Sequence, residues 1–357
     1  MNRYAVIMAG GRGERFWPES RTAKPKQFLT LVGDRSLIQQ SYDRILPLIP
    51  AENIFIVLGK QHLALAKEQL PEIPPENFLV EPVGRNTAPC IGLAAIHIRR
   101  RDPEGVMLVF PSDHMIMGAT DYHQCLEKAF HWAVKENCLV TIGIKPSRPE
   151  TGYGYIEREG DGLDTGPSVF PVRRFVEKPD PERAWEFVQA GCFYWNSGIF
   201  IWKAHVILER IKEHIPELAA GLDRIDPSIG SSQYDEVLGQ VFPNMPSISV
   251  DFGIMEKSPE ILMVQGDFGW DDLGSWGALD RIALRDERGM KIQGDFVGYD
   301  NDDCLIYGQE GLIAALGVQN LIIVRSGEVV MVCDKERSQE VRELVRLCKE
   351  KHLEQYL

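Results

Sequence analysis

A loop rich in glycine and in cations is the part of the sequence whose residue types point most directly to chemistry. It follows a short apolar run, and between residues 12 and 26 it carries five cations and two acids in a protein of formal net charge −13. Glycines let backbone N–H groups approach phosphate oxygens closely, and nearby cations balance the phosphate charge. The loop therefore predicts a polyphosphate site, and its candidate residues are Ala9, Gly10, Gly11, Gly13, Arg15 and Lys26.

Two familiar phosphate-binding loops do not match this segment. A Walker loop requires Gly-Lys followed by Ser or Thr, which is absent here. A Rossmann Gly-x-Gly-x-x-Gly that starts at Gly11 places Phe16 where the third glycine belongs. The loop is therefore of another kind, and the downstream Pro25-Lys26-Gln27-Phe28 argues against a simple glycine turn beside solvated charges.

Two aspartate positions could hold a metal ion. Asp113 follows the apolar run 106–110, and the carboxyl end of a strand is where α/β sheets bind ligands. Asp271 and Asp272 lie far downstream in a loop of Trp and Gly. A hard ion such as Mg²⁺ takes carboxylate oxygens while it keeps waters and substrate phosphates. We therefore expect a Mg²⁺ site that includes Asp113 and one downstream aspartate, with helix or turn capping as the alternative role.

Sparse polar residues within aromatic and apolar strand sequence predict a sugar pocket. Glu177, Lys178 and Asn196 are placed in this way. A carboxylate and a carboxamide can hold vicinal hydroxyls, and an ammonium can pair with a phosphate. The alternative is that the three are solvated surface residues. The sequence has no Gly-x-Ser-x-Gly and no Cys/His pairing, so it predicts no nucleophilic Ser or Cys.

The elements that must position these residues alternate between strands and helices. Short β-branched runs such as 4–9, 54–58 and 106–110 alternate with helical patterns such as 37–46 and 87–100. This alternation predicts an α/β fold with a Rossmann-like, doubly wound, mainly parallel sheet covered on both faces. Ligands are then expected beyond the carboxyl ends of the strands.

The rest of the chain differs in composition and in its pattern of apolar residues. Residues 146–202 are rich in Gly, Pro and aromatic residues and predict an insertion that walls a pocket, and one helical stretch is expected over 204–225. After residue 288, short strand-like runs separated by tight turns predict a small β domain that ends in a charged helix. The sequence shows no repeat of fixed period. We therefore expect a catalytic domain at 1–288 and a C-terminal β domain with its helix at 289–357.

Composition limits the partners of the protein. Its 52 acidic residues against 39 basic ones argue against general binding to nucleic acids or anionic membranes. No run approaches the ~20 apolar residues of a membrane helix, and the first apolar run is too short for a secretory leader. Seven scattered cysteines without a Cys-x-x-Cys spacing argue against a disulfide framework and a zinc site. We expect a cytoplasmic protein with no nucleic-acid or membrane partner.

Seven motifs follow one another in an order that is typical of one enzyme family. They are Gly10–Arg15 with Trp17-Pro18 and Pro25–Phe28, Gly84–Pro89, Pro111–His114, Pro149–Ile156, Phe175–Pro179, Trp195–Phe200 and Gly269–Trp276. Together they resemble the sugar-nucleotide pyrophosphorylases and, more narrowly, the mannose-1-phosphate guanylyltransferases. The sequence departs from the family pattern at Phe16, at Cys90 and at Phe252-Gly253, which leaves the charged positions intact and bears only on pocket shape.

This resemblance implies a nucleotidyltransferase of GT-A-like fold that uses Mg²⁺, GTP and mannose 1-phosphate. The phosphate oxygen of mannose 1-phosphate would attack the α-phosphorus of GTP and give GDP-mannose and pyrophosphate. The implied catalytic residues are Arg15, Lys26, Asp113 and Asp272, the last two as metal ligands, so that Asp272 is selected over Asp271. The implied nucleotide-binding residues also include Glu81, Gly84, Asn86, Thr87 and Ser112, and the implied sugar-phosphate-binding residues are Gly152, Glu177, Lys178 and Asn196.

Glu81 would select guanine, because one carboxylate can accept both the N1–H and the exocyclic amine, a paired contact that adenine lacks. Longer members of the family carry a fused phosphomannose isomerase domain, for which residues 289–357 are too few, so a single activity is expected. A homodimer is one option for the assembly.

Three other functions stay open at this point. A glycosyltransferase that consumes a nucleotide sugar uses a similar sheet and an Asp-held metal, but it does not need the cationic loop. A non-catalytic nucleotide-sugar sensor on the same fold would not need Lys26, Asp113 and Asp272 together. A pyrophosphorylase for another sugar 1-phosphate would keep all of them.

Overall fold

The computed structural model describes residues 2–163, 169–282 and 284–357. Its contacts divide into two compact units, each made of segments that are distant in sequence. The first unit has Met1–Gly10, Tyr42–Ser112 and Ile116–Trp270, and the second has Gly11–Ser41, Asp113–Met115 and Asp271–Leu357. The expected domains at 1–288 and 289–357 are continuous ranges of the chain, whereas each compact unit combines several separate segments. The two domains stay a prediction.

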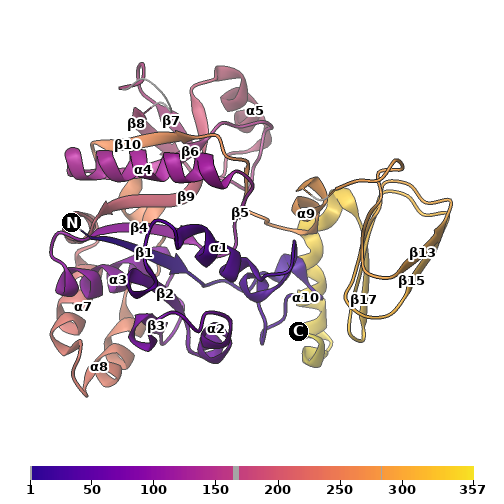
Figure 1. Cartoon of the computed structure of the whole chain (residues 1–357), viewed down its shortest axis with the longest axis horizontal. Coiled ribbons are helices and arrows are strands. Elements are labelled where there is room, and N and C mark those ends of the chain that lie inside the picture. Colours follow the sequence, from indigo (N-terminus) through magenta and orange to yellow (C-terminus); the bar gives the residue numbers. More distant parts are fainter. Residues whose placement is uncertain (1, 164–168, 283) are drawn as a thin grey trace. The chain divides into compact units, whose positions relative to one another are not determined.

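A nine-stranded sheet forms the centre of the first unit, in the order β3-β2-β1-β4-β9-β6-β10-β8-β7 (Figure 1). β3, β2, β1 and β4 are parallel, β9 runs antiparallel between β4 and β6, and β10 is parallel to β6. The strands are β1 Arg3–Met8, β2 Ile54–Gly59, β3 Phe78–Glu81, β4 Val106–Pro111, β6 Leu139–Ile144, β7 Tyr155–Arg158, β8 Val169–Val176, β9 Phe193–Lys203 and β10 Ile261–Gly266.

The sequence explains why the parallel strands are central. β1, β2 and β4 are nearly continuous apolar runs and are almost wholly buried, as strands covered on both faces must be. The predicted α/β fold is confirmed. The antiparallel strands β7, β8 and β9 come from the Gly-, Pro- and aromatic-rich region that the sequence predicts to be an insertion.

Helices cover the sheet of the first unit on both faces. α4 packs against β6, β9 and β10, whereas α3 packs against β1, β2 and β3 and contacts α6 and α7, of which α6 also contacts β9. The helices up to residue 255 are α1 Leu37–Ile45, α2 Leu63–Gln69, α3 Thr87–Arg101, α4 Ala119–Lys135, α5 Pro181–Ala190, α6 Ala204–His214, α7 Pro216–Ile225, α8 Tyr234–Val241 and the π-helix η8 Asp251–Met255.

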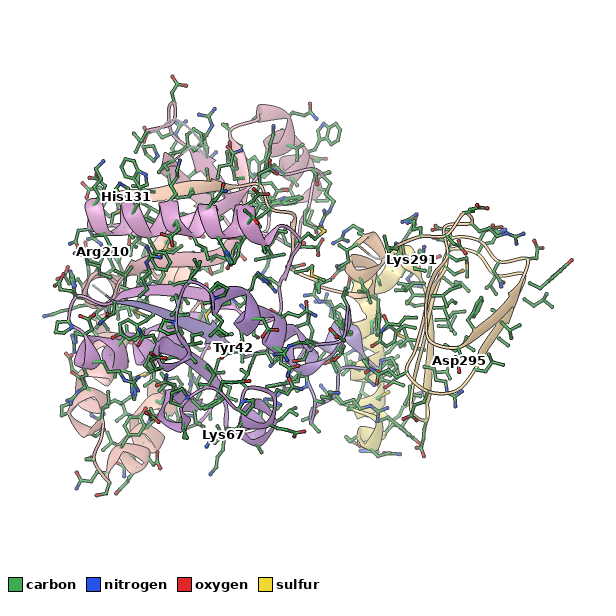
Figure 2. All side chains as sticks on the ribbon, viewed as in Figure 1. Tyr42, Lys67, His131, Arg210, Lys291 and Asp295 are labelled. Atoms are coloured by element: carbon green, nitrogen blue, oxygen red, sulfur yellow. The ribbon has the colours of Figure 1, made fainter. Side chains whose placement is uncertain are left out.

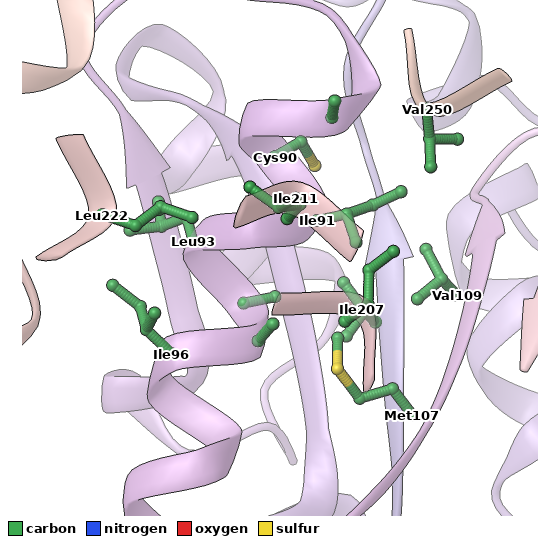
Figure 3. Packing of buried hydrophobic residues seen from close by; sticks show 14 of the residues in the cluster. Cys90, Ile91, Leu93, Ile96, Met107, Val109, Ile207, Ile211, Leu222 and Val250 are labelled. Atoms are coloured by element: carbon green, nitrogen blue, oxygen red, sulfur yellow. The ribbon is translucent and has the colours of Figure 1, made fainter. Parts of the chain in front are cut away.

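One predicted helix is wrong in its extent. The stretch expected over 204–225 is two helices, because Pro216 lacks the N–H that a continuous helix needs and instead begins α7. The interior they enclose is apolar and dense: Figure 3 shows Ile91 and Leu93 of α3 among Ile207, Ile211 and Leu222. This layer fixes α3, whose first residue belongs to a predicted nucleotide-binding motif.

The second unit contains the glycine-rich loop and the C-terminal strands. Two short strands, β5 Met115–Ile116 and β11 Trp270–Asp271, lie where the chain passes from one unit to the other. The remaining elements are α9 Trp276–Ile282, β12 Lys291–Gln293, β13 Phe296–Tyr299, β14 Leu305–Gly308, β15 Ile313–Leu316, β16 Leu321–Ser326, β17 Val329–Asp334 and α10 Val341–Glu350.

The C-terminal strands form parallel rungs rather than a series of hairpins. Lys291 pairs with Leu305, 14 positions on, and Leu305 pairs with Ile322, 17 positions on. β16 and β17 then pair in the antiparallel direction at the edge of this sheet. The uneven spacing of the rungs explains why no fixed-period repeat is visible in the sequence.

Charge pairs join the rungs to α9. The Lys291 ammonium, whose residue is labelled in Figure 2, is buried 2.9 Å from Asp280 of α9, and Lys335 lies 3.1 Å from the same carboxylate. A buried ammonium is costly unless a carboxylate compensates it, so these pairs hold α9 and the C-terminal strands in register. Among the described residues, no helix has the length and apolar character needed to span a membrane.

Candidate active site

The glycine-rich loop has the open backbone that its sequence predicts. A Cβ at Gly10 or Gly11 would meet no heavy atom within 4 Å, and Gly11 has φ 94°, a conformation that side-chain-bearing residues rarely adopt. Gly13 is tight instead: it has φ 61°, and a Cβ there would clash with the Lys26 Cβ. The loop is therefore open where a ligand could approach and closely packed on Lys26.

Lys26 lies at the centre of a compact polar cluster in the second unit. It is 5% exposed, and its Nζ donates to Asp113 Oδ2 at 2.8 Å and to the backbone oxygen of Asp272 at 2.8 Å. The same ammonium lies 5.6 Å from the centre of the Phe16 ring. Three of the four residues predicted to be catalytic are thus joined through one ammonium. We call Lys26, Asp113 and Asp272 the lysine–aspartate cluster.

Burial and charge act in opposite directions on Asp113. Burial raises the pKa of its carboxyl, but the charge and hydrogen bond of Lys26, His114 and a backbone hydrogen bond together lower it by more, and the net pKa is below the ordinary value. Asp113 is therefore a carboxylate at neutral pH, which is the form that binds a metal ion.

The two downstream aspartates have different environments. Asp271 is buried, accepts the Leu273 N–H at 2.9 Å and pairs with Arg281 at 3.0 Å. Asp272 is less buried, and its Oδ1 accepts the Gly274 N–H at 2.9 Å. Leu273 between them has φ 48°, a strained conformation that its fully buried side chain holds in place. The Asp271 carboxylate thus stabilises the turn. This agrees with the expectation that Asp272, and not Asp271, binds the metal ion.

The donor set of this cluster fits a magnesium ion. Mg²⁺ prefers hard oxygen ligands and is held by one or two carboxylates together with waters and substrate phosphates. The carboxylates of Asp113 and Asp272 provide such oxygens. Across the described residues, no group of three or more His, Cys, Asp or Glu side chains could hold a metal ion. A Mg²⁺ ion bound to these two carboxylates would take its remaining ligands from substrate and water.

Arg15 of the loop is held by the C-terminal part of the chain, within the same unit. Its Nη1 donates to Gln339 Oε1 at 2.6 Å, and Gln339 Nε2 in turn donates to Ser275 Oγ at 3.3 Å. Trp17 Nε1 donates to the backbone oxygen of Tyr356 at 2.8 Å, and Glu14 pairs with Lys349 of α10. The C-terminal residues thus hold the loop in place, a contact that the sequence does not indicate.

Glu81 lies at the end of β3 in the first unit, where the fold predicts a ligand. Burial raises the pKa of its carboxyl to about 7, and among the described residues its buried Oε1 has no hydrogen-bond partner. An unpaired buried carboxyl oxygen costs free energy unless a ligand supplies a donor. The chemistry of this position therefore suits a ligand that carries N–H groups.

The motif after Glu81 forms the start of α3. Asn86 has φ 68° and caps the helix by accepting the Thr87 N–H at 2.9 Å, and a Cβ at Gly84 would meet only open space. Ser112 is buried at the end of β4, and its N–H donates to the Met8 oxygen. The Ala9 N–H likewise donates to the Val57 oxygen, at the ends of β1 and β2. These residues lie at carboxyl ends of parallel strands, where nucleotide contacts are expected.

The predicted sugar-binding residues lie before β7, directly after β8 and on β9 of the first unit. A Cβ at Gly154 would lie 2.5 Å from Glu177 Oε2, and the Gly154 oxygen accepts the Asn196 N–H, so Glu177 and Asn196 flank one glycine. Lys178 follows Glu177 at φ 43° and pairs with it at 3.1 Å. Gly152 donates its N–H to Glu150 Oε1 at 3.1 Å, which occupies that donor. The structure thus brings Glu177, Lys178 and Asn196 together.

Asp251 is a residue of this region that the sequence motifs do not indicate. It accepts a hydrogen bond from Asn196 Nδ2 at 2.7 Å. It begins the π-helix η8, a class of short helix that often occurs at functional sites. Its segment departs from the family pattern at Phe252-Gly253, and the carboxylate in front of that pair is the signal that could have found it.

Comparison with known proteins divides the chain near residue 290. Residues 4–289 match the family model described as nucleotidyl transferase, and residues 294–347 match a MannoseP isomerase/GMP-like beta-helix domain. The second match agrees with the parallel rungs of β12 to β16.

Individual relatives cover between three quarters and almost the whole of this chain. A mannose-1-phosphate guanylyltransferase of Klebsiella pneumoniae is 39% identical over 98% of this chain and 75% of its own length. A Thermus thermophilus structure described as a mannose-1-phosphate geranyltransferase matches with TM-score 0.88 and 34% identity, over 98% of this chain and all of that one. A Helicobacter pylori structure described as a mannose-6-phosphate isomerase matches with TM-score 0.63 and 31% identity, over 76% of this chain and all of that one. The chain belongs to the nucleotidyl transferase family, and within it to the group of the mannose-1-phosphate guanylyltransferases.

Proposed function

We propose that the protein transfers GMP from GTP to mannose 1-phosphate and releases pyrophosphate. A phosphate oxygen of mannose 1-phosphate forms the new bond to the α-phosphorus, and the bond from that phosphorus to the oxygen bridging it to the β-phosphate breaks. The products are GDP-mannose and pyrophosphate. The observation that carries the proposal is the lysine–aspartate cluster, in which one buried ammonium joins the Asp113 carboxylate to the Asp272 backbone.

Positioning and charge balance supply most of the catalysis in such a transfer, because the nucleophile comes from the substrate. The open amides at Gly10 and Gly11 bind phosphate oxygens. An ammonium has three N–H donors, and two of those of Lys26 bond to Asp113 and Asp272. The third donor remains for the leaving pyrophosphate. Arg15 adds a second positive charge to the same loop.

Asp113 and Asp272 would hold a Mg²⁺ ion, which supplies charge neutralisation at the reacting phosphates when it is bound. Glu81 accepts the N–H donors of guanine with its buried carboxylate. Glu177 and Asn196 hold hydroxyls of the sugar, and Lys178 pairs with its phosphate.

A panel of substrate pairs tests this proposal. Purified protein with Mg²⁺ is given GTP, ATP, UTP or dTTP together with mannose 1-phosphate or glucose 1-phosphate, and pyrophosphate release is measured. We expect the highest kcat/KM for GTP with mannose 1-phosphate. Release with a different pair would assign another sugar or base, and no release with any pair would favour a nucleotide-sugar sensor. The same protein is also given mannose 6-phosphate, and formation of fructose 6-phosphate is measured. This assay tests whether it has the isomerase activity that the name of the Helicobacter structure indicates.

A further inference from the structure

Asp251 and Asn196 form a contact that nothing in the proposed reaction yet uses. Asp251 Oδ1 accepts Asn196 Nδ2–H at 2.7 Å, while Asn196 Oδ1 accepts the Gly198 N–H at 3.2 Å. Both ends of the Asn196 carboxamide are therefore fixed. A carboxamide has two N–H donors and two carbonyl lone pairs, so one donor and one lone pair are left for a ligand.

The backbone around Asn196 is shaped to present this side chain. The register of β9 against β6 shifts between Thr141 and Gly143, beside Asn196, and Gly198 has φ 67°. Such irregularities redirect a side chain that would otherwise alternate regularly across the sheet. Ser197 Oγ donates to the Ile142 oxygen at 2.7 Å and closes the irregular stretch.

The segment that contains Asp251 also binds the start of the predicted nucleotide motif. The Val250 N–H donates to Thr87 Oγ1 at 2.8 Å, and the Ala88 N–H donates to the Ile248 oxygen at 3.1 Å. Val250 is fully buried in the core that α3 shares with α6. Residues 248–251, which we call the linking segment, thus join Thr87 at one end to Asn196 at the other, within one compact unit.

We propose that Asp251 is a positioning residue that sets the orientation of the Asn196 carboxamide toward the sugar, and that the linking segment keeps this orientation aligned with the nucleotide loop. This inference rests on the proposed function, because it assigns Asn196 to mannose 1-phosphate. In this assignment Asp251 acts through Asn196.

The charge of Asp251 explains how it imposes one orientation. An ionised carboxylate only accepts hydrogen bonds, so the amide nitrogen of Asn196, and not its oxygen, must face it. Burial raises the pKa of Asp251 to about 6, with further increases from the Glu177 and Glu256 carboxylates, which outweigh the lowering by the Asn196 hydrogen bond. Above that pH the carboxylate is ionised and the orientation is fixed. An Asn at position 251 could either accept or donate a hydrogen bond. It would therefore fix the orientation of the Asn196 carboxamide less strictly.

Three variants test the proposal at pH 8: Asp251→Ala, Asp251→Asn and Glu256→Gln. The last is the matched control, because it removes an exposed carboxylate just after the same π-helix while the Asp251–Asn196 hydrogen bond stays intact. For each full-length protein the measured quantities are kcat, KM for mannose 1-phosphate, KM for GTP and the unfolding temperature.

For Asp251→Ala we expect KM for mannose 1-phosphate to rise about tenfold, the size of one lost charge-assisted hydrogen bond, with KM for GTP within about twofold of wild type. Asp251→Asn should recover part of this loss, and Glu256→Gln should match wild type. An unchanged KM for mannose 1-phosphate in Asp251→Ala overturns the proposal. So does a parallel rise in both KM values with a lower unfolding temperature, which marks a purely structural role. A wild-type protein with no turnover would instead refute the proposed function.

Discussion

Glu81 is the residue at which recognition of the base can be tested separately from catalysis. Its buried Oε1 lies at the end of β3 and has no hydrogen-bond partner among the described residues. Removal of a paired hydrogen-bond contact costs ~1–3 kcal/mol of selectivity. We expect Glu81→Ala to lower the preference for GTP over ATP by that amount, measured as the ratio of kcat/KM values. If the ratio is unchanged, another group reads the base.

The pKa of Glu81 gives a second prediction at the same residue. Burial raises this pKa to about 7, so the carboxyl is mostly protonated below pH 7 and must lose its proton to accept two guanine N–H groups. Binding of GTP should therefore weaken by about tenfold for each pH unit well below 7. Glu81→Gln should remove this part of the pH dependence, since it cannot ionise. Dissociation constants for GTP between pH 5.5 and 8, in wild type and variant, check it, and identical slopes would contradict it.

The two aspartates proposed to hold Mg²⁺ should behave as one functional group. Asp113→Ala and Asp272→Ala should each lower kcat by about a hundredfold and raise the Mg²⁺ concentration needed for half-maximal rate. Because both would serve one ion, the double variant should be little worse than the poorer single variant. Asp267→Ala, which removes an exposed aspartate from the loop before β11, is the control. Additive losses would mean that the two carboxylates act independently.

At the scale of elements, the residues just before the C-terminal helix position the glycine-rich loop. Gln339 accepts from Arg15 Nη1 at 2.6 Å. We expect Gln339→Ala to raise KM for GTP by roughly three- to tenfold, because Arg15 loses this hydrogen-bond partner and must be ordered by the substrate instead. The control is Arg337→Ala, which removes an exposed side chain that pairs with Glu340, and it should leave KM unchanged. Equal effects in both variants would contradict this role.

The elements also show which features a sequence can predict. β1, β2, β4 and β6 follow from continuous apolar runs. Pro216 is visible in the sequence and could have placed the break between α6 and α7. The parallel rungs after residue 288 could not be predicted, because their spacing of 14 and 17 residues has no constant period.

The candidate site divides in the same way. Gly13, Lys26 and Asp113 are found from residue types and motif order, since their chemistry is local to the loop and the strand end. The pairing of Asp251 with Asn196 and that of Gln339 with Arg15 are not found in this way, because the two partners are distant in sequence. Long-range pairings of single polar residues leave no periodic pattern, so only the structure reveals them.

At the scale of the whole molecule, most of the glycine-rich loop and the C-terminal strands share one compact unit, and the predicted base and sugar motifs share the other. The β-helix region is therefore part of the unit that contains the lysine–aspartate cluster. A core of Phe16, Trp276 and Tyr307, from the loop, α9 and β14, packs this unit together.

The proposed transfer depends above all on the positive charge of Lys26. The most direct measurement is kcat for pyrophosphate release by Lys26→Ala against Lys24→Ala, an exposed cation two positions earlier in the same loop. Loss of one preorganised donor to developing phosphate charge costs ~100-fold or more. We predict that loss for Lys26→Ala in a protein that remains folded by circular dichroism, and a rate near wild type for Lys24→Ala. A folded Lys26→Ala that keeps more than about a third of the wild-type kcat would contradict the proposed role.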